Sequence, residues 1–255
     1  MKDIVRQWAN VLATATTIVV NALANALPFN GQTTAAISDR FAVYFVPAGY
    51  VFSIWGAIYV GMIAYSAYQA LPSQRANPRL RRIGYIYLLT CAANCGWLFL
   101  WHYEQFVWTL VAMGILLVAL IAIYRSLHTG ESRIGAAERW AVVVPFSIYL
   151  GWITVATIAN VTDVLYYLHW DGWGVSGQAW AVTMLAVGGL IAGAVSLPRR
   201  DTAYLLVILW AFVGIAVRQS AAPVVAGAAL GVAAALALLM LARTLRPSGR
   251  SIALR

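Results

Sequence analysis

Long apolar runs alternate with short polar segments along the whole chain. Eight runs can be marked, at residues 8–27, 50–71, 83–103, 107–126, 139–160, 178–197, 202–217 and 222–242. Most of them are close to the ~20 residues that an α-helix needs to cross a hydrocarbon layer of ~30 Å. The pattern therefore predicts an all-α fold, a polytopic membrane bundle of about eight transmembrane helices.

The seventh and eighth runs lie close together, but a single helix does not explain them. At 1.5 Å per residue, a helix over residues 202–242 would extend about 60 Å, twice the thickness of the hydrocarbon layer. Between the runs lie the polar residues Arg218, Gln219 and Ser220, followed by Pro223. Since proline interrupts a helix, we expect two separate spans with a break at residues 218–220.

Composition supports a membrane protein and argues against a soluble or nucleic-acid-binding protein. The 255 residues are 62% hydrophobic and 10% charged, with a mean hydropathy of +0.78, whereas about 25% of a soluble protein is charged. The net charge of +9 comes from residues between the apolar runs, so no nucleic-acid partner is expected.

Cys91 and Cys95 are expected to stay unbridged in one helix. The three histidines, His102, His128 and His169, have no metal-ligand spacing, so no metal site is expected.

The positions of the basic residues set the orientation. With eight spans and the N-terminus inside, every Lys and Arg except Arg40 and Arg218 lies on the inner side. An odd number of spans would place the Arg-rich C-terminal tail on the opposite side from the other basic residues. We therefore expect an integral protein of the bacterial inner membrane, with the lipid bilayer as a partner and both termini in the cytoplasm.

The second span begins with aromatic residues that share a helical face. Trp55 and Tyr59 are four positions apart, Gly56 leaves a notch beside them, and Pro47 stands before the helix. Rings beside a small residue suit the floor of a pocket for a flat apolar ligand. Interfacial aromatic residues that only pack have the same pattern, so both interpretations stay open here.

The third and fifth spans carry amides beside tryptophans. Asn94 and Trp97 are three positions apart in the third span, and Trp152, Ala156 and Asn160 form a stripe at steps of four in the fifth. An amide in the membrane interior must find a hydrogen-bonding partner, so each Asn is expected to face the bundle. Helix–helix hydrogen bonding and contact with a ligand are the two roles considered for each.

Two outer loops are long enough to have a role of their own. Residues 28–46 are long for a helix connector and are either a lid over a site or plain surface. Residues 166–180 combine Tyr, Trp and Gly. Such a segment forms an interfacial aromatic belt or, as the alternative, a cap over a ligand.

Together these stretches resemble the TspO family, the translocator or tryptophan-rich sensory proteins. The resemblance covers roughly residues 8–168. The matching residues are Pro47, Ile54-Trp55-Gly56, Tyr59 and Met62, then Asn94-x-x-Trp97 and Trp108, and finally Tyr149-Leu150-Gly151-Trp152, Ala156 and Asn160.

The resemblance implies a five-helix core over residues 1–168 with a ligand cavity opening toward the first long loop. Residues 169–255 would then add three transmembrane helices and a basic cytoplasmic tail. Family members bind tetrapyrroles such as protoporphyrin, and some bind sterols, but the basic motif after the fifth span is absent, since residues 161–168 contain no Lys or Arg. The candidate ligand-binding residues are Pro47, Trp55, Tyr59, Asn94, Trp97, Tyr149, Trp152, Ala156 and Asn160.

These observations favour a membrane protein that binds a planar hydrophobic ligand, a porphyrin-type tetrapyrrole above all, in a sensory, regulatory or transport role. No cofactor is required for this. No general acid–base pair marks a conventional enzyme, although the resemblance would allow light-driven porphyrin breakdown. A rhodopsin-type photoreceptor is excluded because the only lysine, Lys2, precedes the first span.

The alternative function is a secondary transporter of another small solute. Proton-coupled carriers bury a carboxylate near the middle of the membrane, and the acids of this chain are expected at span ends. Asp163, three residues beyond Asn160, is the acid nearest to a span. In the last span, Gly227 and Gly231 have the GxxxG spacing, which suits a homodimer as well as packing within one chain.

Overall fold

The computed structural model describes residues 2–27, 29–129 and 134–245. Pro28, Arg133 and the basic residues of the C-terminal tail lie outside these ranges. Within them the chain forms helices and no strand. The helical segments are α1 (Lys2–Ala26), η1 (Phe29–Gly31), α2 (Thr34–Ser38), η2 (Gly49–Ser53), α3 (Ile54–Ala70), η3 (Pro72–Gln74), α4 (Pro78–Ile83), α5 (Ile86–His102), α6 (Phe106–Leu127), α7 (Ala136–Glu138), the π-helical η4 (Arg139–Val143), α8 (Val144–Tyr167), η5 (Gly172–Gly174), α9 (Gly177–Arg199), α10 (Thr202–Arg218) and α11 (Pro223–Leu245).

The long helices follow the apolar runs and confirm a helical membrane bundle. Among the described residues, six segments are long and apolar enough to cross a membrane: α1, η2 with α3, α6, α7 with α8, α9 and α11. The remaining two long helices, α5 and α10, have 17 residues each, or about 26 Å of helix at 1.5 Å per residue. The expected break is present, because α10 ends at Arg218 and α11 begins at Pro223.

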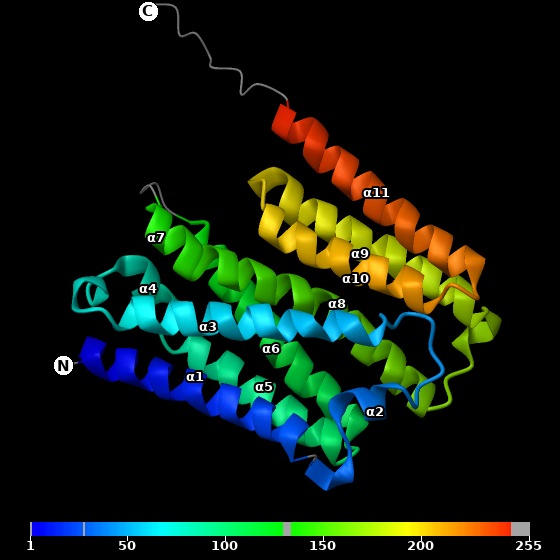
Figure 1. The fold of residues 1–255 in the computed structure, drawn as a ribbon, viewed down its shortest axis with the longest axis horizontal. Coiled ribbons are helices and arrows are strands. Elements are labelled where there is room, and N and C mark those ends of the chain that lie inside the picture. Colours follow the sequence, from blue (N-terminus) through cyan, green and yellow to red (C-terminus); the bar gives the residue numbers. More distant parts are fainter. Residues whose placement is uncertain (1, 28, 130–133, 246–255) are drawn as a thin grey trace, which may run out of the picture.

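Helix α8 lies at the centre of the bundle. It packs against α3 and α6 on one side and against α10 on the other. Helix α5 packs against α1 and α6, while α9 and α10 each pack against α11, so the last three helices form a layer beside α8 (Figure 1). The C-terminal helices therefore support the central helix of the bundle.

Charged residues gather at the two ends of the helices. The start of α1 lies near α4 and α7 at one end, and α2 lies at the other (Figure 1). At the α2 end, Arg40 pairs with Glu104 at 2.9 Å and Arg218 pairs with Asp39 at 2.9 Å. These two arginines are the ones that the sequence assigns to the outer side.

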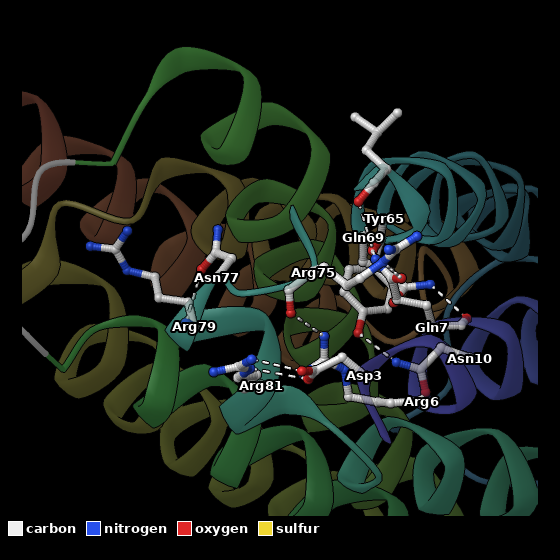
Figure 2. A network of polar contacts seen from close by, with 11 residues as sticks. Asp3, Arg6, Gln7, Asn10, Tyr65, Gln69, Arg75, Asn77, Arg79 and Arg81 are labelled. Carbon is white, nitrogen blue, oxygen red and sulfur yellow. Dashed lines mark hydrogen bonds and ion pairs between the residues drawn. The ribbon is translucent and has the colours of Figure 1, made fainter. Parts of the chain in front are cut away.

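A polar network at the opposite end ties α1 to its neighbours (Figure 2). Arg81 of α4 donates two hydrogen bonds to the Asp3 carboxylate, at 3.0 and 2.6 Å. The side chains of Gln7 and Gln69 each donate to the other residue's backbone carbonyl, so α1 and α3 are joined by a reciprocal pair. Buried amides satisfied in this way fix the register of two membrane helices.

The glycines of the last helices divide into two groups. A Cβ at Gly189 in α9 would overlap Val232 of α11, so this glycine allows close packing within the chain. Gly227 and Gly231 are exposed and have open space beside them. The homodimer expected from their spacing stays a prediction.

Candidate functional site

A cavity of about 210 Å³ lies within the first five long helices and under α2. Its walls come from α1, α3, α5 and α8, with contributions from α6 and from the segment before α3. The lining residues are Asn21, Asn25, Thr34, Ala35, Ser38, Val46, Pro47, Phe52, Trp55, Tyr59, Asn94, Trp97, Leu98, Trp101, Met113, Leu116, Trp152, Ile153, Val155, Ala156, Ala159, Asn160 and Asp163.

Stacked rings form the α3 side of the cavity. The rings of Trp55 and Tyr59 stack with centroids 5.6 Å apart and planes 25° apart, as their spacing of four predicts. Trp152 of α8 meets Trp55 edge to face at 6.3 Å, a geometry that aromatic pairs prefer. Gly56 is exposed and lies outside the lining. The expected notch at Gly56 is therefore wrong, because one residue further along a helix turns the side chain by about 100°.

Asn94 of α5 lines the cavity and links three helices. It accepts a hydrogen bond from Asn21 Nδ2 of α1 at 2.8 Å, and its own Nδ2 donates to the Tyr149 hydroxyl of α8 at 3.1 Å. Tyr149 is 2% exposed and does not itself line the cavity. Its ring meets Trp55 edge to face at 5.9 Å, so Tyr149 supports a wall residue from behind.

Asn160 of α8 fixes the orientation of Trp97. Its Oδ1 accepts from Trp97 Nε1 at 3.1 Å, and its Nδ2 donates to Thr109 Oγ1 of α6 at 2.9 Å. The Trp97 ring in turn stacks on Trp101 with centroids 5.2 Å apart. Both amides expected from the sequence therefore join helices and also face the cavity.

Asp163 is the residue whose environment differs most from expectation. It continues the stripe of Trp152, Ala156 and Asn160 along α8, and it lines the cavity while only 5% exposed. Its place one turn before the end of α8 agrees with the expectation that acids lie at span ends, but its burial in the cavity lining was not expected. The signal was present in the sequence, since three residues after Asn160 is the same helical face.

Helix α2 closes one end of the cavity. Thr34, Ala35 and Ser38 of α2 belong to the lining. Trp101 Nε1 donates to the Thr34 carbonyl at 3.2 Å, which fastens α2 to α5. Residues 29–46 thus have the position of a lid, as one of the two interpretations of this loop anticipated.

His102 at the end of α5 contacts the start of α2 and the segment before it. It is fully buried and lies outside the cavity lining. Its Nδ1 contacts the Leu98 carbonyl oxygen at 2.8 Å, and its Nε2 lies 3.5 Å from the Thr34 hydroxyl. The side chain of Asn30 donates to the His102 carbonyl at 3.0 Å.

Glu104 links the rest of the loop before α3 to the α5–α6 turn. It accepts hydrogen bonds from Gln32 at 3.0 Å and from Arg40 at 2.9 Å. These bonds and the charge of Arg40 hold the pKa of the Glu104 carboxyl below its ordinary value. The carboxylate therefore stays ionised near neutral pH, and the loop contacts persist there.

A second cavity of about 380 Å³ lies between residues 42–45, the end of α8 and the start of α9. Trp170, Trp173 and Trp180 form one aromatic cluster with ring centroids 5.2 to 6.0 Å apart. Trp180 Nε1 donates to the Gly172 carbonyl at 2.9 Å. Trp170 and Trp180 border the cavity, so this loop both covers a hollow and presents exposed rings.

The structure brings eight of the nine candidate residues around one cavity, and Tyr149 stands directly behind them. Sequence reasoning did not select the other lining residues, among them Asn21 and Asn25 of α1, the α2 residues, and Trp101, which lies one turn after Trp97. No group of three or more His, Cys, Asp or Glu in the described ranges is placed to hold a metal ion.

The fold and the site define an α-helical integral membrane protein with an aromatic cavity inside its helical bundle. A family model described as TSPO-like protein matches residues 7–242. The chain therefore belongs to the TSPO-like protein family. No curated protein and no solved structure matches the chain. The matched region includes α9, α10 and α11, so it reaches beyond residues 8–168, where the sequence resemblance was recognised. The division into a core over 1–168 and an addition over 169–255 stays a prediction.

Proposed function

We propose that this protein binds a planar hydrophobic ligand in the bundle cavity, with a porphyrin-type tetrapyrrole as the first candidate, in a sensory, regulatory or transport role. The observation that carries the proposal is the convergence of four indole rings on one cavity, those of Trp55, Trp97, Trp101 and Trp152. Flat rings offer large apolar faces to a flat ligand at little cost in side-chain entropy.

The size of the cavity bears on how a macrocycle would enter. At about 210 Å³ the cavity is smaller than the ~300 Å³ or more of most ligand pockets. We therefore expect a tetrapyrrole to insert one edge between the indoles, with the remainder lying under a displaced α2. A smaller planar ligand would fit without this displacement.

A fluorescence titration tests the proposal. The purified full-length protein in detergent is titrated with protoporphyrin while its Trp emission is followed, beside Trp55→Phe and Trp152→Phe variants. We expect saturable quenching, with binding weakened roughly three- to tenfold in each variant, because each loses part of an aromatic contact.

Trp140→Phe is the matched control for this titration. Trp140 lies in η4, is 70% exposed and does not line the cavity, so its loss should leave the affinity unchanged. Quenching that does not saturate, or that is the same in all four proteins, would show that porphyrin does not occupy this cavity.

One observation favours a second candidate function, a secondary transporter of another small solute. Asp163 is a carboxyl buried in a cavity within the bundle, the kind of group through which proton-coupled carriers act. Loss of solute uptake into proteoliposomes in Asp163→Asn, with ligand binding retained, would favour the carrier. Unchanged uptake in that variant would remove this candidate.

We propose that the protein lies in the bacterial inner membrane with both termini in the cytoplasm. The charge distribution supports this orientation, since Arg40 and Arg218 lie at the α2 end, whereas Arg6, Arg75, Arg79 and other basic residues gather at the opposite end (Figure 2).

A further inference from the structure

No basic side chain forms an ion pair with Asp163 within the described part of the protein. Its side chain is buried, and its Oδ1 has no hydrogen-bond partner. None of the ion pairs among the described residues includes Asp163. A buried carboxyl oxygen without a partner costs free energy, and such groups in native proteins call for an explanation.

Three N–H donors of the cavity wall donate to residues other than Asp163. Trp97 Nε1 donates to Asn160, Asn160 Nδ2 donates to Thr109, and Trp101 Nε1 donates to the Thr34 carbonyl. These bonds join helices and fix ring orientations. The carboxyl of Asp163 is therefore left available to a molecule that enters the cavity.

The charge of the lining is one-sided. Asp163 is its only acid, and it contains no Lys, Arg or His among the described residues. An anionic group placed inside would find no cation, whereas a positively charged group would find an acid that can ionise beside it, together with the faces of indole rings. Cations are attracted to both.

We propose that Asp163 anchors the ligand through a positively charged amine, so that the cavity selects flat aromatic cations over neutral and anionic rings of the same size. This inference rests on the proposed function and adds the charge class of the ligand. It favours planar ligands that carry an amine; a porphyrin, whose ring nitrogens are neutral at neutral pH, would occupy the cavity without this anchor.

Three probes with one ring system isolate the charge. They are 9-(aminomethyl)anthracene, a cation at neutral pH, the neutral 9-methylanthracene and anthracene-9-carboxylate. Each is titrated into the full-length protein at one fixed detergent concentration, and binding is followed by energy transfer from Trp to the anthracene ring. For the unsubstituted protein we expect the cation to bind about tenfold more tightly than the neutral ring, and the anion to bind most weakly.

Asp163→Asn keeps the shape of the side chain and removes its charge. We expect this variant to lose the preference for the cation while its affinity for the neutral ring changes little. Asp163→Leu, which also removes the polar atoms, should lose the same preference. A cation preference that persists in both variants would overturn the inference.

Asp171→Asn is the matched control, because Asp171 borders the second cavity and the amide can still accept from Trp173 N. This variant should retain the selectivity of the unsubstituted protein. Loss of selectivity here, and not in the Asp163 variants, would place the cation in the second cavity and refute the assignment.

The outcomes also separate this inference from the proposed function. Saturable binding of all three rings with equal affinity, weakened by Trp55→Phe, would support the aromatic cavity and overturn the role of Asp163. Failure of every ring to saturate would count against the cavity as a binding site and against the anchor as well.

Discussion

Asn160 shows how one side chain in the bundle interior serves structure and site together. It is 2% exposed, accepts from the Trp97 indole and donates to Thr109. A buried amide that uses both its oxygen and its nitrogen leaves two groups without that bond when it is removed. The residue therefore matters to the stability of α5, α6 and α8 and to the direction of one cavity wall.

We predict that Asn160→Leu destabilises the protein by about 1–3 kcal/mol, since the Trp97 N–H loses its acceptor and the Thr109 oxygen loses the bond that it accepts, in a dry environment. The measurement is thermal or denaturant unfolding in detergent, followed by near-UV circular dichroism to report the Trp97 environment. Ligand affinity should fall as well, because Trp97 is no longer held in place.

Thr157→Val is the control for that substitution. Thr157 lies on the same helix and makes only a local bond to the Ile153 carbonyl, so a change below about 0.5 kcal/mol is expected. If the two variants were equally stable, the hydrogen bonds of Asn160 would contribute nothing beyond those of an ordinary helix residue.

At the scale of elements, η2 connects the cavity to the C-terminal helices. The backbone N–H of Ala48 donates to the Gly214 carbonyl of α10 at 3.0 Å, and Trp210 Nε1 donates to the Val51 carbonyl at 3.2 Å. Since Pro47 and Phe52 flank these contacts and line the cavity, α10 positions one of its walls from behind.

Gly214 is the point of closest approach between α10 and η2, because a Cβ there would overlap Val51 Cγ2. We predict that Gly214→Ala displaces η2, lowers the thermal stability and weakens ligand binding, although the residue touches no ligand. The double variant Gly214→Ala with Val51→Ala removes the overlapping methyl group and should recover much of the binding.

Gly227→Ala provides the comparison for this prediction. Gly227 lies in α11 with open space around it, so alanine should be neutral there or stabilise the helix by up to about 1 kcal/mol. An equal loss of ligand affinity in Gly214→Ala and in the double variant would mean that steric contact with Val51 does not cause the weaker binding.

At the scale of the whole molecule, the two ends of the bundle differ in charge and in structure. The α1 end carries the network of Asp3, Gln7, Gln69 and Arg81 (Figure 2), and the other end carries the lid over the cavity. The proposed orientation therefore makes the cavity accessible from the outer side of the membrane.

Cysteine labelling tests that orientation. In a variant with Cys91 and Cys95 replaced by alanine, Ser73→Cys and Val175→Cys introduce single thiols at exposed positions of opposite ends. We predict that a membrane-impermeant maleimide applied to intact spheroplasts labels Val175→Cys and leaves Ser73→Cys unlabelled until the cells are lysed. The reverse pattern would invert the proposed topology.

The sequence alone determined the number of long helices and their approximate boundaries, because transmembrane length and apolar composition are properties of a single segment. It also determined which residues share a face, as with Trp55 and Tyr59, or Trp152 and Asn160, since helical periodicity is local. These two rules, with the family resemblance, were enough to select eight residues that the cavity brings together.

The tertiary structure decided which faces meet. Periodicity does not specify how far each helix is rotated against its neighbours, so it could not separate Tyr149, behind the wall, from Trp152, within it. It could not show that Gly56 faces outward or that α10 supports Pro47 across more than 160 positions of sequence. The role proposed for Asp163 depends on the same long-range packing, because only the assembled helices place a buried carboxyl in a cavity with its Oδ1 unpartnered among the described residues.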